Sequence, residues 1–261
     1  MLPGISTACL YPMNTEESLQ TLSALRPACM EVFLNAEQEL KPAFLQELRA
    51  RADTAGTKIV TVHPYSSAVE PMLFFSSYAR RFEDGLALYR RFYQAAKILG
   101  ADCVVFHGDY KFSPLPREEY FSRFARVWKE AREHGISLCQ ENVDRCVSHS
   151  VHFLTEMRQA LPQVEYILDV KQAVRAGESV WEVARAMGEK IKHVHISDHN
   201  ESESCLPPGQ GVLNIGDLLS AIAKNASCES AIVELYGENF GDIVELSASF
   251  QHLCTVVSTR S

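Results

Sequence analysis

Six side chains that bind cations or transfer protons follow short apolar runs of the sequence. Each run resembles a buried strand, and the polar residue stands at its end: His63, His107, Glu141, Asp169, His195 and Glu234. A polar residue at the end of a buried strand needs a partner or a function. Carboxylates and imidazoles that converge in one cavity repel each other or stay unpaired unless a cation lies among them. If these residues meet, we expect a divalent metal ion held by oxygen and nitrogen ligands.

The strand-like runs alternate with amphipathic segments along the whole chain. The runs cover residues 4–11, 29–35, 58–64, 102–108, 136–142, 166–170, 191–197 and 231–237. Helical spacing of apolar residues predicts helices over 75–99 and 117–134, which Gly100 and Gly135 should end. Eight strand–helix units in 261 residues predict a single (β/α)8 TIM barrel domain over residues 1–261, with all strand ends at one rim. The competing open doubly wound sheet would usually show a glycine-rich phosphate turn after its first strand, and none is present.

The composition narrows the class of protein and its partners. The chain is 46% hydrophobic, which suits a large core, and its net charge of −8 argues against a nucleic-acid partner. Its eight cysteines include no CxxC pair and are typical of reduced thiols in the cytoplasm. The N-terminus lacks a secretion signal, and no apolar run reaches the roughly 18 residues of a membrane span. We expect a soluble cytoplasmic protein; the sequence leaves open whether two barrels pair as a homodimer.

The segments around the strand ends form a recognisable series of motifs. In chain order they read VHP, FHG, EN, LDVKQAVRAG, HVHISD and LPPGQG. This series resembles the xylose isomerase-like TIM barrel superfamily, which contains sugar phosphate isomerases and epimerases, inosose dehydratase and the AP endonucleases of family 2. The resemblance covers essentially the whole chain and is specific for the superfamily rather than for one activity. It implies that the metal ligands are Glu141, Asp169, His195 and Glu234, and that His63 and His107 bind substrate.

Two departures from the motifs bear on the number of metal ions. Many relatives read Asp-x-x-His-Ala after the sixth strand, whereas this chain reads DVKQA, so that Gln172 replaces the histidine. The endonucleases also need Asp-x-His before the glycine loop, where this chain has Glu203 and Cys205. An amide is a poor metal ligand beside an imidazole. We therefore expect one divalent ion, Mn²⁺, Zn²⁺, Mg²⁺ or Co²⁺, rather than three zinc ions.

The resemblance implies a metal-dependent sugar or sugar-phosphate isomerase or epimerase. The ion would lower the pKa of the C–H next to a carbonyl and stabilise the enediolate, while Glu141 and Glu234 transfer the proton. An inosose-type dehydratase would begin with the same proton abstraction and then expel a hydroxyl. An endonuclease IV-like AP endonuclease would need more metal ligands and basic DNA-gripping loops. A barrel that only binds a sugar is the non-catalytic alternative.

Three further residues complete the expected substrate site: Lys171, Asp198 and Cys205. Lys171 would share a strand face with Asp169 if the sixth strand continued, and it would then reach the substrate. The alternative for Lys171 is an ion pair with Asp198 or Asp109. Asp198 is also expected to orient His195 or a loop, because ligating imidazoles usually need such a partner.

Four other residues receive weaker assignments. His193 should lie one layer deeper in the barrel than His195 and serve the structure. Arg145 and Tyr65 are candidate substrate contacts, and Glu31 is a candidate for the rim because it lies in the second strand.

Overall fold

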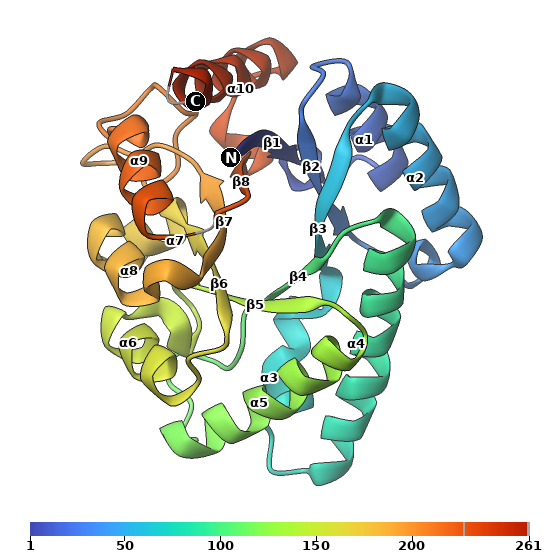
Figure 1. Ribbon diagram of the computed structural model, residues 1–261, viewed down its shortest axis with the longest axis vertical. Helices are drawn as coiled ribbons and strands as arrows, with labels where there is room; N and C mark the ends of the chain where they lie inside the picture. Colours follow the sequence, from blue (N-terminus) through green and yellow to red (C-terminus); the bar gives the residue numbers. More distant parts are fainter. Residues whose placement is uncertain (227, 260–261) are drawn as a thin grey trace.

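Eight parallel strands pair in the order of the sequence, and the eighth pairs with the first to close a barrel (Figure 1). The computed structural model describes residues 1–226 and 228–259. The strands are β1 Leu2–Ser6, β2 Cys29–Leu34, β3 Lys58–Pro64, β4 Cys103–Phe106, β5 Ser137–Glu141, β6 Glu165–Asp169, β7 Ile191–Ile196 and β8 Ser230–Val233. The predicted (β/α)8 barrel is confirmed.

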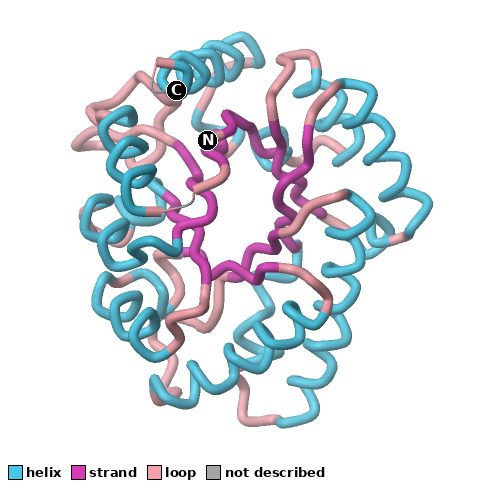
Figure 2. The backbone as a smooth tube through the Cα atoms, in the orientation of Figure 1, coloured by secondary structure: helices cyan, strands magenta, loops and turns pink. Residues whose placement is uncertain are grey.

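Helices surround the ring of strands on its outer side (Figure 2). They are α1 Thr15–Ser23, α2 Pro42–Ala55, α3 Glu70–Phe74, α4 Ala79–Leu99, α5 Arg117–Glu133, α6 Val151–Ala160, α7 Val170–Arg175, α8 Val180–Met187, α9 Ile215–Asn225 and α10 Ile243–Ser258. Within the part of the chain that the structure describes, none of these helices is long and apolar enough to cross a membrane.

Several predicted element boundaries differ from the structure, and two of the differences have a clear local cause. The first strand was expected over 4–11, but it ends at Ser6, whose hydroxyl accepts a bond from the Ala8 amide and starts a 3-10 turn. The helix expected over 75–99 begins at Ala79, because α3 ends at Phe74 and Tyr78 is 56% exposed. Gly100 does end α4, with a φ of 80° that few other residues adopt.

The strand register brings the reactive positions to a common level. Asp169, the last residue of β6, pairs with His195 on β7. Glu141 is the last residue of β5, and Glu234 directly follows β8. Every residue of β7 is buried, so His193 and His195 point inward at successive layers while their neighbours face the helices. The Nδ1 atom of His193 lies 2.6 Å from the Ser230 hydroxyl, as a structural role requires.

A buried carboxylate holds the loop that follows β4. The Oε2 atom of Glu70 accepts bonds from the backbone amides of His107 at 2.8 Å and Gly108 at 2.6 Å, and the Tyr89 hydroxyl donates to its Oε1 atom. Burial raises the pKa of Glu70 from 4.5 to about 7, against the opposing effects of His107 and these hydrogen bonds. The charged form is therefore disfavoured in the folded protein relative to the unfolded chain.

We predict that Glu70 makes the protein less stable as the pH rises from about 4.5 to about 7. In this window the folded state holds a proton that the unfolded state has released, and the shift corresponds to about 3 kcal/mol in the free energy of unfolding. Urea unfolding at pH 5 and pH 8 should show a smaller difference for Glu70→Gln than for the wild type. Glu17→Gln, at an exposed position in α1, is the control. Equal differences in Glu70→Gln and wild type would contradict the assignment.

Candidate metal centre and active site

Four side chains from the ends of β5 to β8 meet at one end of the barrel. One ligand atom from each of Glu141, Asp169, His195 and Glu234 lies within 4.8 Å of the others. The Nδ1 atom of His195 lies 3.1 Å from Glu141 Oε1, 3.2 Å from Glu234 Oε2 and 3.7 Å from Asp169 Oδ2. None of the four residues is more than 8% exposed. The structure thus brings together the four residues that the motifs single out.

Backbone contacts fix the end of β6 beside the end of β5. The side chain of Asn142 accepts a bond from the Asp169 amide at 2.8 Å and donates to the Asp169 carbonyl at 2.9 Å. Asp169 is also the N-cap of α7, since its Oδ1 atom accepts the Gln172 amide at 3.0 Å. Its Oδ2 atom is left for the cluster. These bonds hold the carboxylates of Glu141 and Asp169 as neighbours.

Glu31 belongs to the cluster, although the sequence indicated only a place near the rim. It is completely buried, its Oε1 atom accepts the Ser6 hydroxyl at 2.9 Å, and its Oε2 atom lies 3.1 Å from His195 Nε2. A carboxylate at Nε2 keeps the proton on that nitrogen and leaves Nδ1 as the ligating atom. The sequence signal was a charged residue inside the apolar run CMEVFL.

Lys171 lies among these acids. Its ammonium donates to Asp169 Oδ2 and to Glu234 Oε2, and the residue is only 3% exposed. The strand does not continue past Asp169, as the shared-face argument assumed, because α7 begins at Val170. The side chain reaches the same oxygens from the first turn of this helix. The partners are therefore Asp169 and Glu234, not Asp198 or Asp109.

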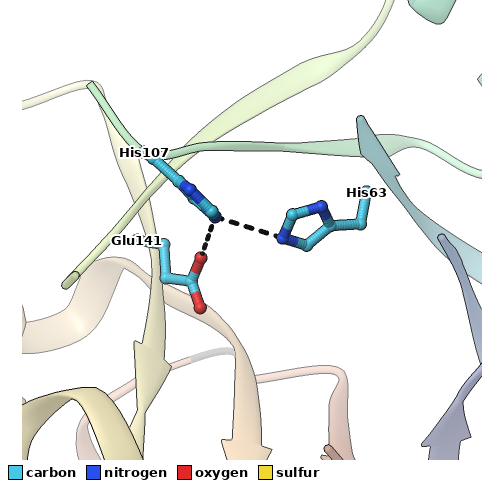
Figure 3. A group of neighbouring side chains, drawn as sticks. All are labelled: His63, His107 and Glu141. Atoms are coloured by element: carbon cyan, nitrogen blue, oxygen red, sulfur yellow. Dashed lines mark hydrogen bonds and ion pairs between the residues drawn. The ribbon is translucent and has the colours of Figure 1, made fainter. Parts of the chain in front are cut away.

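His63 and His107 form a second group with Glu141 (Figure 3). The Nε2 atom of His107 lies 2.8 Å from Glu141 Oε2 and 3.1 Å from His63 Nε2. All three are buried, and their ligand atoms are close enough to hold a cation. The guanidinium of Arg145 lies 3.2 Å from the other ring nitrogen of His107. Glu141 thus joins the two groups through its two oxygens.

The pKa shifts follow from burial opposed by the charges of neighbours. Burial lowers the pKa of His195, but the carboxylates of Glu31 and Glu234 reverse this and raise it well above its ordinary value. Burial raises the pKa of Glu141, but His107 and His195 bring it well below its ordinary value. Burial dominates at Asp169 and raises its pKa to about 6 despite Lys171. Burial also lowers the pKa of His63.

A cavity of about 520 Å³ opens over the cluster. Three of the four candidate metal ligands line it, Glu141, Asp169 and Glu234. His63, His107 and Lys171 line it as well. Arg145 and Tyr65, the candidate substrate contacts, also line it. Its size is that of a small-molecule site. Imidazole, carboxylate and ammonium groups, which can exchange protons, therefore line one cavity with three of the candidate ligands.

Asp198 and Cys205 do not lie on this cavity wall. The two oxygens of Asp198 accept backbone amides from Gly209, Gly211 and Leu213, and from His199, at 2.9–3.1 Å. Asp198 therefore orients a loop, one of the roles expected for it, and has no contact with His195. The Cys205 thiol is 2% exposed, and burial raises its pKa to about 11. The structure places neither side chain at the expected substrate position.

The donor set fits a divalent ion. Glu31, Glu141, Asp169 and Glu234 are four buried carboxylates. Among the residues that the structure describes, Lys171 is the only lysine or arginine whose side chain forms an ion pair with any of them. Three of the carboxylates and the Nδ1 atom of His195 already converge. Oxygen and imidazole ligands of this kind suit Mn²⁺, Co²⁺, Mg²⁺ or Zn²⁺.

Comparisons with known proteins agree with this architecture. The family model described as xylose isomerase-like TIM barrel matches residues 27–254. Among curated proteins, none has a sequence that matches this chain.

Solved structures with the same fold include enzymes of more than one kind. A D-psicose 3-epimerase with D-tagatose, from Clostridium cellulolyticum H10, has a TM-score of 0.78 at 16% identity, with 99% of each chain covered. An IOLI protein with a bound zinc atom has a TM-score of 0.78 at 18% identity, covering 99% of this chain and 97% of the other. The probable 3-DHS dehydratase AsbF from Bacillus anthracis has a TM-score of 0.76 at 14% identity, covering 97% and 99%. At these identities the likeness shows the shared fold.

We predict that Glu31→Ala weakens divalent-ion binding about 10- to 100-fold, the usual effect of removing a carboxylate that orients a ligating histidine. The His195 ring would lose the partner that holds its Nε2 proton. Calorimetric titration with Mn²⁺ would measure the affinity, and circular dichroism would check the fold. Glu37→Ala, the next glutamate along the chain and an exposed partner of Arg91, is the control. An unchanged affinity in Glu31→Ala would contradict this role.

Proposed function

The chain belongs to the xylose isomerase-like TIM barrel family, and from that premise we propose that it is a divalent-metal-dependent isomerase or epimerase of a sugar or sugar phosphate. One observation carries the proposal. The carboxylates of Glu141 and Glu234 both line the cavity, and both lie within 3.2 Å of the same nitrogen of His195. Two carboxylates at one small-molecule site suit the removal of a proton from carbon and its return.

The ligands of the ion would be Glu141, Asp169, His195 and Glu234, with Glu31 holding the histidine ring. When bound, a divalent ion supplies Lewis-acid polarisation of a carbonyl oxygen and stabilises the enediolate that forms on proton loss. This chemistry suits a hydroxy-carbonyl substrate such as a ketose. The fold likeness to a D-psicose 3-epimerase agrees with this substrate class.

Glu141 and Glu234 would then handle the proton. They come from the end of β5 and from the residue after β8, with β6 and β7 between them. A substrate held between them would present the two faces of one carbon to the two carboxylates. In an epimerase one glutamate takes the proton and the other returns it to the opposite face. In an isomerase the same glutamate can return it to the adjacent carbon.

The other cavity residues would bind the substrate hydroxyl groups. His63 and His107 offer ring nitrogens from β3 and from the loop after β4. His63 is held neutral because burial lowers its pKa, so it can both donate and accept a hydrogen bond. Arg145, Tyr65 and Lys171 line other parts of the same wall.

We predict that Glu234→Gln lowers the rate of proton transfer about 10²- to 10⁴-fold, because the amide cannot accept the proton. Exchange of substrate C–H with solvent deuterium, followed by NMR over a panel of ketoses and ketose phosphates at saturating Mn²⁺, measures that step. Wild-type activity should vanish after chelation and return with Mn²⁺.

Glu229→Gln is the matched control, because Glu229 precedes β8 at the other end of the barrel and pairs with Lys192. Its exchange rate should stay close to that of the wild type. Full activity in Glu234→Gln would contradict the proposed role. Loss of water from the substrate instead of epimer or isomer formation would assign the protein to the dehydratases.

A further inference from the structure

The Lys171 ammonium lies against two of the carboxylates that the proposed function assigns to the metal ion. It donates to Asp169 Oδ2 and Glu234 Oε2, the same oxygens that face His195 Nδ1 at 3.7 and 3.2 Å. Asp169 Oδ1 accepts the Gln172 amide at the start of α7, so Oδ2 is the oxygen of that carboxylate that can contact a cation. A lysine cation and a ligand nitrogen thus share one pair of oxygens.

We propose that Lys171 is a tethered cation that competes with the divalent ion for Asp169 and Glu234, so that binding of the ion requires the ammonium to leave them. Two cations cannot share the same small set of oxygens without strong repulsion. The competition weakens binding of the ion and makes it exchangeable. This inference rests on the proposed metal centre and names how access to that centre is controlled.

The Tyr236 ring is the second position that we infer for the displaced ammonium. From its place against the two carboxylates, the Lys171 nitrogen lies 5.4 Å from the centre of this ring, within the range of a cation–π contact. Tyr236 lines the cavity, and its hydroxyl accepts bonds from Gln172 at 3.3 Å and Arg175 at 3.1 Å. A short movement of the side chain toward this ring would free both carboxylates and keep the positive charge at the cavity wall.

Charge balance favours exchange of position over permanent exclusion of the ion. Glu31, Glu141, Asp169 and Glu234 carry four carboxylates with at most 8% exposure. The single positive charge of the Lys171 ammonium compensates only part of this negative charge. The histidines would have to compensate the rest. A divalent ion together with Lys171 at the Tyr236 ring compensates more of it than either cation alone.

The test is calorimetric titration of the full-length, chelator-treated protein with Mn²⁺. Lys171→Met should bind Mn²⁺ at least about tenfold more tightly than the wild type, given the coupling energies of close charge pairs. Lys171→Gln, which keeps polarity without charge, should shift the affinity in the same direction. Lys97→Met is the control, since Lys97 is exposed in the last turn of α4, before β4 and at the other end of the barrel. Its affinity should equal that of the wild type.

A second variant tests the resting place of the ammonium. Tyr236→Leu should weaken Mn²⁺ binding by about threefold, the magnitude of a cation–π contact, and should have no effect in the Lys171→Met background. A role of Tyr236 in folding alone would lower affinity in both backgrounds. Circular dichroism of each variant checks the fold.

The outcomes separate this inference from the proposed function. Equal or weaker Mn²⁺ binding in Lys171→Met and Lys171→Gln overturns the competition, while ketose exchange activity in the wild type would leave the proposed enzyme standing. If neither the wild type nor the lysine variants bind a divalent ion, both the competition and the metal centre fail. Tighter binding in both Lys171 variants, with Lys97→Met unchanged, supports the inference.

Discussion

Negative charge concentrated at one end of the barrel is the constraint on which the site depends. Glu31, Glu141, Asp169 and Glu234 approach one another with little solvent to screen them. Buried carboxylates in such a group are tolerated only when cations and hydrogen bonds compensate them. His195 contacts all four acids, and Lys171 contacts two. The end of the barrel is therefore suited to hold positive charge, and the proposed function assigns part of that charge to a divalent ion.

A second tier of polar contacts keeps this cluster in place, and nearly all of them end on the backbone. Glu70 accepts the amides that follow β4, Asn142 joins the ends of β5 and β6, and Asp198 collects amides of the loop before α9. Bonds to the backbone fix where a strand ends rather than where one side chain points. The reactive side chains are thus positioned largely by the scaffold, and Asp169 adds one bond of its own through the Oδ1 atom that caps α7.

Local periodicity predicts the barrel and places six reactive residues at one rim, while the four that converge as candidate ligands are implied by the resemblance to the family. Each of these residues ends an apolar run, and in a barrel all such ends share one rim. The contact of Glu31 with His195 could not be predicted in this way, because the two residues are 164 positions apart in the chain. Only the closed ring of strands brings them together. The partners of Lys171 could not be predicted for a local reason. The chain changes from strand to helix at Val170, and this change decides where the Lys171 side chain points. For Asp198 the sequence leaves two roles open, substrate binding and orientation of His195 or a loop, and its bonds to the backbone amides of Gly209, Gly211 and Leu213 match the orientation of a loop.

The residues that line the cavity around the candidate metal ligands, rather than the fold, would determine the reaction. Epimerases and a probable dehydratase share this fold, so the barrel alone does not select between them. In this chain Gln172 replaces the histidine of many relatives, and its amide accepts the Asp144 N–H and donates to the Tyr236 hydroxyl. It therefore joins the loop after β5 to the loop after β8, beside Lys171. These two loops carry Arg145 and Tyr236, which both line the cavity.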